Sequence, residues 1–242
     1  MEFSLHRQLK EAYCSPTDEI EVPLGNYRID VVTDSALVEI QSSSLSAIRN
    51  KIKQLLKKHT VTVVKPIIGR KWIMKQDGRG GKLLSKRLSP KKGNALSVFD
   101  ELVYFTKVFP HPRLTLETPV VSVEEFRYPG HGRRRWRRDK DFRIEDLRLV
   151  SIDQSLTLRD TDDLLQMLPI DQLPVEFGTA ELAEQLDVHR LVAQKIAYCL
   201  RETGAVKWVG KQGNALRYRL KKCPRKIKSR CKERDLESRS AG

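Results

Sequence analysis

The chain lacks long apolar runs and paired cysteines, and each absence argues against a class of protein. No stretch of its 242 residues approaches the roughly 18 consecutive apolar residues of a membrane-spanning helix. Its four cysteines form no CxxC pair, and no histidine lies at zinc-ligand spacing, so we expect free thiols and no structural zinc. The opening stretch MEFSLHRQLKEAY lacks the apolar core of a signal peptide. We therefore expect a cytoplasmic protein, nucleoid-associated if the source is a bacterium.

Acidic residues are also in short supply relative to basic ones. The chain has 46 lysines and arginines against 31 aspartates and glutamates, which gives a net charge of +15 and a pI of about 9.8. Such an excess is typical of proteins with a polyanionic partner, because neutralising phosphates releases their counterions. A basic protein without such a role, or a ribosome-associated factor, is the alternative. The charge favours nucleic acid as the partner.

The first seventy residues alternate in a way that predicts a compact α/β unit. The apolar spacing indicates helices over 3–14 and 45–58, the second preceded by capping serines at 42–44. Alternation and β-branched residues predict strands over 19–24, 27–32, 36–41 and 60–68, with a hairpin turn at Gly25-Asn26. The expected order is helix, three strands, helix, strand.

The middle of the chain gives weaker patterns. We interpret the Gly- and Lys-rich segment 76–93 as a mobile loop, 95–109 as a helix and 118–128 as a strand. A basic loop follows at 129–141.

A second domain is expected after residue 157. The pattern predicts helices over 161–168, 179–186 and 191–204, then two strands within 205–220. Helix, turn, helix and hairpin are the layout of a winged helix. We therefore divide the chain into a domain of residues 1–157, a winged-helix DNA-binding domain of residues 158–220 and a disordered basic tail of residues 221–242.

Two acids lie within the otherwise apolar strands of DVVTDSALVEIQ. If Asp34 and Ser35 form the turn, Asp30 lies directly opposite Glu39 on one sheet face, with Arg28 opposite Gln41. Like charges at that spacing repel, and a divalent cation between them would remove the conflict. Oxygen ligands suit Mg²⁺ or Mn²⁺. Three alternatives stay open: solvent-facing acids, neutralisation by Arg28, and a one-residue register slip that separates the two acids.

This arrangement resembles the PD-(D/E)xK nuclease superfamily, over roughly residues 2–68. The resemblance implies an α/β, restriction-endonuclease-like mixed sheet flanked by helices. It assigns metal binding to Asp30 and Glu39, with the Ile40 backbone carbonyl and Glu11 on the first helix as further ligands. The family usually has lysine at the position of Gln41, although some restriction enzymes have E-x-Q there. The resemblance leaves Gln41 to position the water or the phosphate.

The resemblance implies metal-assisted phosphodiester hydrolysis with Mg²⁺ or Mn²⁺ as cofactor. The expected substrate is DNA, with RNA less favoured, and a homodimer is an open possibility for double-strand cutting. Retention of both acids favours an active enzyme. Gln41 supports the alternative, a catalytically inactive nuclease-fold protein that only binds DNA, and the arginine-rich loops leave an RNA-associated factor open.

Candidate DNA contacts lie in three segments. The helix after the catalytic strands offers Arg49 and Lys53, whose alternative is a solvated basic face. The basic loop offers Arg133, Arg134, Arg135, Trp136, Arg137 and Arg138, whose rings and guanidinium groups suit bases and phosphates. The predicted recognition helix and wing offer His189, Arg190, Gln194, Lys195, Arg201, Lys211, Gln212, Asn214 and Arg217, although many winged helices bind protein instead.

Overall fold

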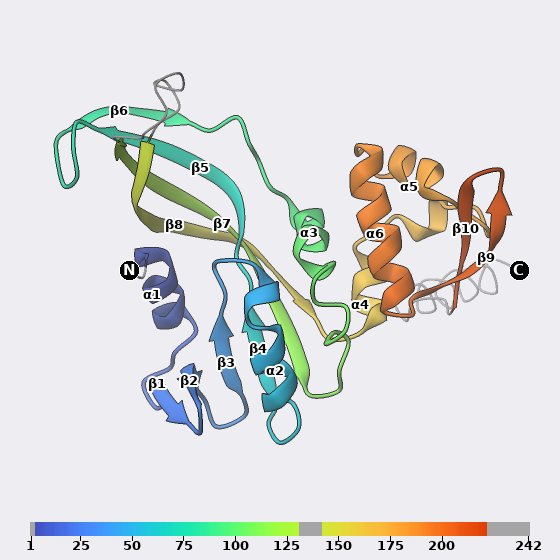
Figure 1. Ribbon diagram of the computed structural model, residues 1–242, viewed down its shortest axis with the longest axis horizontal. Helices are drawn as coiled ribbons and strands as arrows, with labels where there is room; N and C mark the ends of the chain where they lie inside the picture. Colours follow the sequence, from blue (N-terminus) through green and yellow to red (C-terminus); the bar gives the residue numbers. More distant parts are fainter. Residues whose placement is uncertain (1–2, 131–141, 222–242) are drawn as a thin grey trace, which may run out of the picture. The chain divides into compact units, whose positions relative to one another are not determined.

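The structure, a computed structural model, describes residues 3–130 and 142–221 and divides into two compact units (Figure 1). The first comprises the residues up to Ser97 together with Thr115–Thr157, and the second comprises Val98–Leu114 together with the residues from Leu158 onward. The sequence-based division placed 98–114 in the first domain. That segment instead packs with the second unit, because Phe99 and Leu102 on it are fully buried and its helix contacts a C-terminal helix.

An eight-stranded mixed sheet forms the first unit. Its order is β1-β2-β3-β4-β7-β5-β6, and β8 pairs with β7. The β1–β2, β2–β3 and β5–β6 pairs are antiparallel, whereas the β3–β4 and β5–β7 pairs are parallel. The strands are β1 (Glu19–Leu24), β2 (Tyr27–Val32), β3 (Leu37–Ile40), β4 (Val61–Val64), β5 (Ile67–Gln76), β6 (Leu83–Leu88), β7 (Leu114–Pro129) and β8 (Phe142–Leu158). The predicted class, an α/β fold with a mixed sheet and flanking helices, is confirmed.

Two helices accompany the N-terminal strands. Helix α1 (Ser4–Ala12) buries Leu5 and Leu9 against β3 and its neighbours, because these residues are four positions apart and share one helix face. Helix α2 (Arg49–Leu55) follows a 3₁₀ turn, whose capping residue Ser44 accepts a hydrogen bond from the Ser46 N–H. The core under α1 consists of Leu5, Leu9, Val31, Val38, Ile40, Val64, Val121 and Val123.

The predicted register of the β2–β3 hairpin is confirmed. The Thr33 N–H donates to the Ala36 carbonyl at 3.0 Å, which leaves Asp34 and Ser35 as the turn residues. Val32 pairs with Leu37, and Val31 pairs with Val38. Continuing the same count places Asp30 opposite Glu39.

Two local predictions for the first unit differ from the structure. The strand expected over 60–68 breaks at Lys65-Pro66 into β4 and the start of β5. The segment 76–93, expected as a loop, contains β6, whose ladder with β5 runs from Trp72–Leu88 to Gln76–Leu83. Pairing with the preceding strand β5 stabilises β6, although its sequence, LLSKRL, has none of the β-branched or aromatic residues that favour strands.

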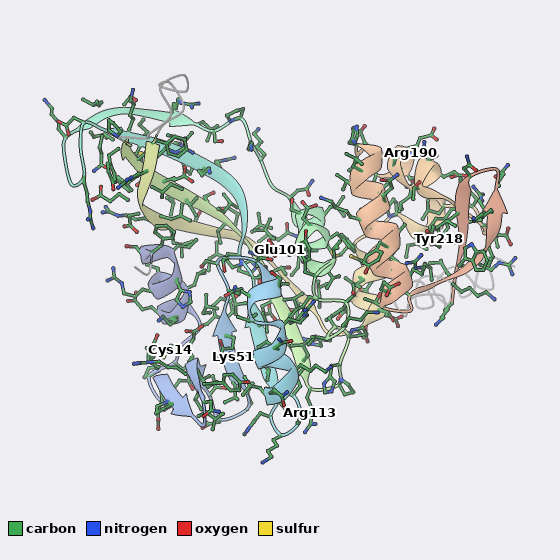
Figure 2. All side chains as sticks on the ribbon, in the orientation of Figure 1. Cys14, Lys51, Glu101, Arg113, Arg190 and Tyr218 are labelled. Atoms are coloured by element: carbon green, nitrogen blue, oxygen red, sulfur yellow. The ribbon has the colours of Figure 1, made fainter. Side chains whose placement is uncertain are left out.

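The second unit combines four helices with a two-stranded sheet. The elements are α3 (Val98–Leu102), α4 (Thr161–Gln166), α5 (Thr179–Gln185), α6 (Arg190–Glu202), β9 (Val206–Gln212) and β10 (Ala215–Leu220). Helix α3 is much shorter than the helix expected over 95–109, although Phe105 and Phe109 beyond its end are also buried. Its residues pack on α6, where the Cys199 thiol donates to the Phe99 carbonyl. Figure 2 shows Arg190 at the start of α6 and Tyr218 on β10.

Candidate functional site

Asp30 lies where β2 and β3 separate. Its Oδ2 accepts a hydrogen bond from the Ile40 N–H at 2.8 Å. This bond takes the place of the next backbone hydrogen bond between β2 and β3. The Oδ1 of Asp30 lies 3.3 Å from Nε2 of His6 on α1. Burial opposes ionisation of Asp30, but these two hydrogen bonds and the nearby positive charges outweigh it and lower its pKa. Asp30 is therefore an ionised, oriented carboxylate at neutral pH.

Glu39, the second acid of the pair, is almost completely buried, with 3% of its surface exposed. Its Oε1 lies 2.6 Å from Nζ of Lys51 on α2, and the same ammonium group donates to the Arg28 carbonyl at 2.5 Å. Burial raises the pKa of Glu39 to about 7, and Lys51 only partly offsets the effect. The Glu39 carboxyl therefore changes its charge near neutral pH.

A third acid, Glu21, joins the row from β1. Ile20–Val31 and Val22–Ile29 pair on either side of it, so Glu21 lies across from Asp30. Its backbone has φ of 59°, an uncommon conformation for a residue with a side chain. Glu21 pairs with Lys10 of α1 and with Arg28, and the hydrogen bond from Lys10 lowers its pKa. Glu21 was missed in the sequence, although the alternation of EIEVPL, continued across the first hairpin, could have placed it across from Asp30.

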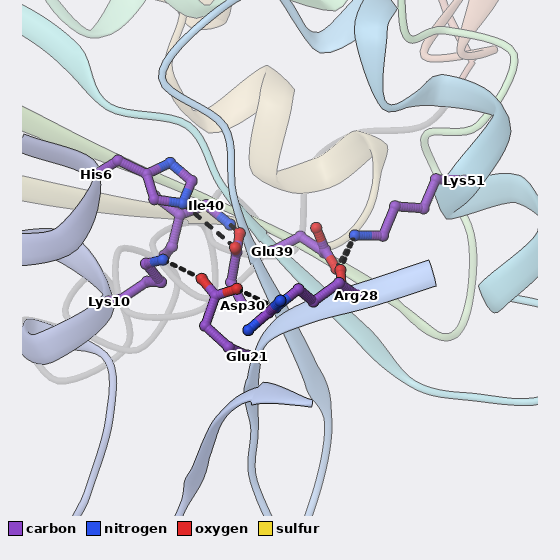
Figure 3. A network of polar contacts seen from close by, with 8 residues as sticks. All are labelled: His6, Lys10, Glu21, Arg28, Asp30, Glu39, Ile40 and Lys51. Carbon is purple, nitrogen blue, oxygen red and sulfur yellow. Dashed lines mark hydrogen bonds and ion pairs between the residues drawn. The ribbon is translucent and has the colours of Figure 1, made fainter. Parts of the chain in front are cut away.

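Basic side chains from two helices and a strand surround these acids (Figure 3). His6 and Lys10 are four residues apart on α1 and reach Asp30 and Glu21, while Lys51 reaches Glu39 from α2. The electrostatic conflict that the sequence predicted is therefore met partly by protein cations. Lys51 was missed in the sequence, although it lies four residues before the buried Leu55 and so lies near the inner side of α2.

The other predicted catalytic groups lie differently from expectation. Glu11 is exposed on α1, outside the network of Figure 3. The Gln41 amide donates to Ser43 Oγ at 2.7 Å and to the Ser44 carbonyl at 2.8 Å, so it holds the following loop. Ile40 contributes its N–H to Asp30. Arg49 and Lys53 are exposed on α2.

The predicted DNA contacts of the second unit divide into exposed and internal groups. Lys195 pairs with Asp100 at 2.7 Å, and Arg201 pairs with Glu202 at 3.0 Å. Arg217, expected on the wing, instead bonds Glu181 and the Glu176 carbonyl. The His189 ring caps α6 by accepting from the Leu191 N–H. Of these only Arg217 is half-buried; Lys195, Arg201 and His189 are exposed, as are Arg190, Gln194, Lys211, Gln212 and Asn214, whereas Arg133–Arg138 lie outside the described residues.

Asp30 and Glu39 fit Mg²⁺ as a donor set. Both offer oxygen ligands, and Mg²⁺ is commonly held by one or two carboxylates. The buried Glu39 carboxyl, with its raised pKa, is the group that a neighbouring cation would return to the ionised form. Within residues 3–130 and 142–221, no group of three or more His, Cys, Asp or Glu residues is placed to hold a metal ion. Cys14 and Cys199 are free thiols, and burial raises the pKa of Cys199 to about 12.

Comparison with known proteins shows that the chain belongs to the family described as a domain of unknown function, DUF8091, whose model matches residues 3–159. That match contains the whole carboxylate cluster. An uncharacterized protein of Treponema pallidum (strain Nichols) is 30% identical over 221 residues, which cover 90% of this chain and 85% of that protein. No solved structure matches the chain significantly.

Proposed function

We propose that this protein is a metal-dependent nuclease that hydrolyses phosphodiester bonds in DNA. The observation that carries the proposal is the placement of Asp30 and Glu39 next to the Val31–Val38 pair of two antiparallel strands, where the charge of Asp30 adds to the rise in the Glu39 pKa and Lys51 pairs with Glu39. Carboxylates can hold a divalent cation, and a cation and an ammonium group can both stabilise the charge that develops on a phosphate during hydrolysis.

The order of elements supports the same proposal. Helix α1, the antiparallel β1–β2–β3 sheet, α2, and then β4 parallel to β3 resemble the core of the PD-(D/E)xK superfamily, a restriction-endonuclease-like arrangement. The carboxylates lie on the second and third strands, where that superfamily carries its acids. The family's element usually ends in a lysine, and this chain has Gln41 at that position. We infer that Lys51 on α2 supplies the ammonium group instead.

Each residue of the cluster then has a distinct task. Asp30 and Glu39 would hold Mg²⁺, which when bound supplies water activation and charge neutralisation at a phosphate. His6 and the Ile40 N–H orient Asp30. Lys51 keeps positive charge beside Glu39 and can face a phosphate oxygen when Glu39 is engaged elsewhere. Lys10 and Arg28 hold Glu21 beside the pair.

The second unit supports a targeting role for its helices and hairpin. Helices α5 and α6 and the β9–β10 hairpin follow one another in winged-helix order, and Arg190 and Gln194 are exposed at the start of α6. Lys211 adds an exposed charge on the hairpin. We propose that this unit binds DNA.

A specific observation favours a second candidate, a nuclease-fold protein that binds DNA without cutting it. Lys51 already neutralises Glu39, Lys10 and Arg28 neutralise Glu21, and His6 hydrogen-bonds Asp30, as they would in a site that has lost its metal.

Cleavage of plasmid and single-stranded DNA with Mg²⁺ or Mn²⁺ separates the two candidates. We expect cutting by the natural protein, none by Asp30→Asn or Glu39→Gln, and unchanged cutting by the control Glu11→Gln, which alters an exposed acid on α1. Calorimetric titration with Mg²⁺ gives an independent readout, since the first two variants should lose metal binding. Absence of cutting and of metal binding, with DNA binding retained by all variants, would establish the second candidate.

A further inference from the structure

The β5–β6 ribbon, residues 67–93, carries the densest positive charge of the first unit. It contains nine lysines and arginines against one acid, Asp77. Strand β6 ends the strand order of the sheet, at the edge opposite β1 (Figure 1). Every residue of β6 is exposed. The ribbon therefore presents its charge along an open sheet edge.

Few of these charges are neutralised by the protein. Lys71 pairs with Glu125 at 2.7 Å, and Lys86 pairs with Glu124 at 2.8 Å. Within the described residues, no carboxylate lies within ion-pair distance of five further exposed cations, namely Lys75, Lys82, Arg87, Lys91 and Lys92. Like charges gathered without counterions repel one another, so binding an external polyanion at this edge would reduce the repulsion.

The turn that closes the ribbon is held in place. The Asp77 N–H donates to the Lys82 carbonyl, and the Gly81 N–H donates to the Gly78 carbonyl, each at 3.1 Å. The Gly80 N–H donates to the Glu145 carboxylate of β8, also at 3.1 Å. Gly80 has φ of +66°, a conformation that glycine adopts without strain. The ribbon is thus a formed element that can present its charges in a fixed pattern.

The arrangement fits nucleic acid better than a lipid surface. An element that enters a membrane carries its apolar side chains at its tip, whereas this tip reads DGRGGK; the exposed Leu83 and Leu84 follow it at the start of β6, and Leu88 lies at the far end of that strand. The ten residues of β5 span about 30 Å at about 3.3 Å each. Duplex DNA presents about one negative charge per 1.7 Å of its axis, so a row of cations of this length can meet several phosphates.

An aromatic side chain adds a second feature of nucleic-acid surfaces. Arg70 lies 6.0 Å and Lys86 lies 5.7 Å from the centre of the Trp72 ring on β5. Cations stacked on an aromatic ring are held side by side and present a fixed pair of positive groups.

We propose that the β5–β6 ribbon is a phosphate-backbone binding surface, with which the first unit grips nucleic acid independently of the second unit. The choice of nucleic acid as occupant rests on the proposed function. Binding by the ribbon, however, is measurable without cleavage.

The test compares two triple variants of the full chain that remove equal charge from exposed positions of the first unit. The ribbon variant is Lys82→Ala, Arg87→Ala, Lys92→Ala. The matched control is Arg7→Ala, Lys57→Ala, Lys58→Ala, on α1 and at the end of α2. Binding of a fluorescent 30-base-pair duplex is followed by anisotropy in EDTA over a series of salt concentrations, beside vesicles of phosphatidylserine and phosphatidylcholine.

We expect the ribbon variant to lose roughly tenfold or more in affinity and to lower the salt slope by about 2 to 3, near one unit per phosphate contact. The control should change both much less. Equal behaviour of the two variants would overturn the proposal, as would a loss confined to the vesicles. Tight binding by the natural protein without Mg²⁺-dependent cutting would refute the nuclease and leave the ribbon assignment standing.

Discussion

At Glu39, burial and charge act in opposite directions, and the balance sets its behaviour near neutral pH. The side chain is surrounded by the sheet and by α2, and its single close cation is Lys51 among the described residues. Asp30, close by, keeps a lowered pKa because the Ile40 N–H and His6 bond it. Two carboxylates in one cluster therefore have pKa values shifted in opposite directions, which is common where acids have different tasks.

This difference predicts a dependence of stability on pH. The folded protein holds the Glu39 proton up to pH about 7, above the ordinary value of 4.5, so unfolding releases it in that window. Stability should fall as pH rises from 4.5 to 7, by on the order of 3 kcal/mol at most. Asp30, with a lowered pKa, contributes stability that is lost only as pH falls below 3.8.

Urea unfolding in EDTA at pH 5, 6, 7 and 8 measures this effect when the natural protein is compared with Glu39→Gln. The variant should lack the fall, because its amide does not titrate. If the stability of the two proteins changes with pH in parallel, the Glu39 proton does not cause the fall.

Lys51 predicts a second effect at the residue scale. Lys51→Met removes the charge that holds the Glu39 pKa down, so the fall in stability should extend above pH 7. DNA cleavage should decrease roughly 100-fold, as it does when one charge-stabilising donor is lost. Lys58→Met, an exposed lysine just after the end of the same helix, is the matched control and should resemble the natural protein in both measurements. Similar losses in both variants would contradict the role of Lys51.

At the scale of elements, Arg217 shows how a residue expected at an interface can belong to the interior. It extends from β10 to Glu181 on α5 and to the Glu176 carbonyl, and 19% of its side chain is exposed. A guanidinium group held by a carboxylate and a carbonyl joins two segments far apart in sequence. Its neighbour on the hairpin, Lys211, is exposed.

The two residues should therefore respond oppositely to truncation. Arg217→Ala should destabilise the second unit by about 1–3 kcal/mol, because it removes the hydrogen bonds from β10 to Glu181 and to the Glu176 carbonyl. Lys211→Ala should change stability by less than about 0.5 kcal/mol and should weaken DNA binding instead. Denaturant unfolding and hydrogen exchange of α5 and β10 measure the first effect. Unchanged stability in Arg217→Ala would restore the wing role that the sequence suggested.

At the scale of the whole molecule, the net charge of +15 is the dominant property. No helix in the described residues is long and apolar enough to cross a membrane. If the protein makes six to ten phosphate contacts, its affinity for DNA should fall by roughly 10³ to 10⁵ between 50 and 200 mM salt. Anisotropy titrations without metal ions provide the measurement. Affinity that is insensitive to salt would exclude a phosphate-backbone mode of binding.

Sequence patterns predicted the N-terminal elements because the forces there are local. Alternation and a two-residue turn set the β2–β3 register, and therefore the opposition of Asp30 and Glu39. Leu5 and Leu9 identified the inner face of α1 by their spacing alone. The same local rules failed at β6, whose strand conformation comes from pairing with β5, and at 98–114, whose burial comes from contacts with α6.

The sequence by itself determined the fold class, the opposed acids and the excess of positive charge, because periodicity, turn chemistry and composition need no distant partner. Tertiary structure decided which side chains complete the cluster. It turned Gln41 toward the Ser43–Ser44 loop, brought Lys51 to Glu39, and placed Glu21 beside Asp30. These contacts join different strands and helices, so they depend on how the elements pack.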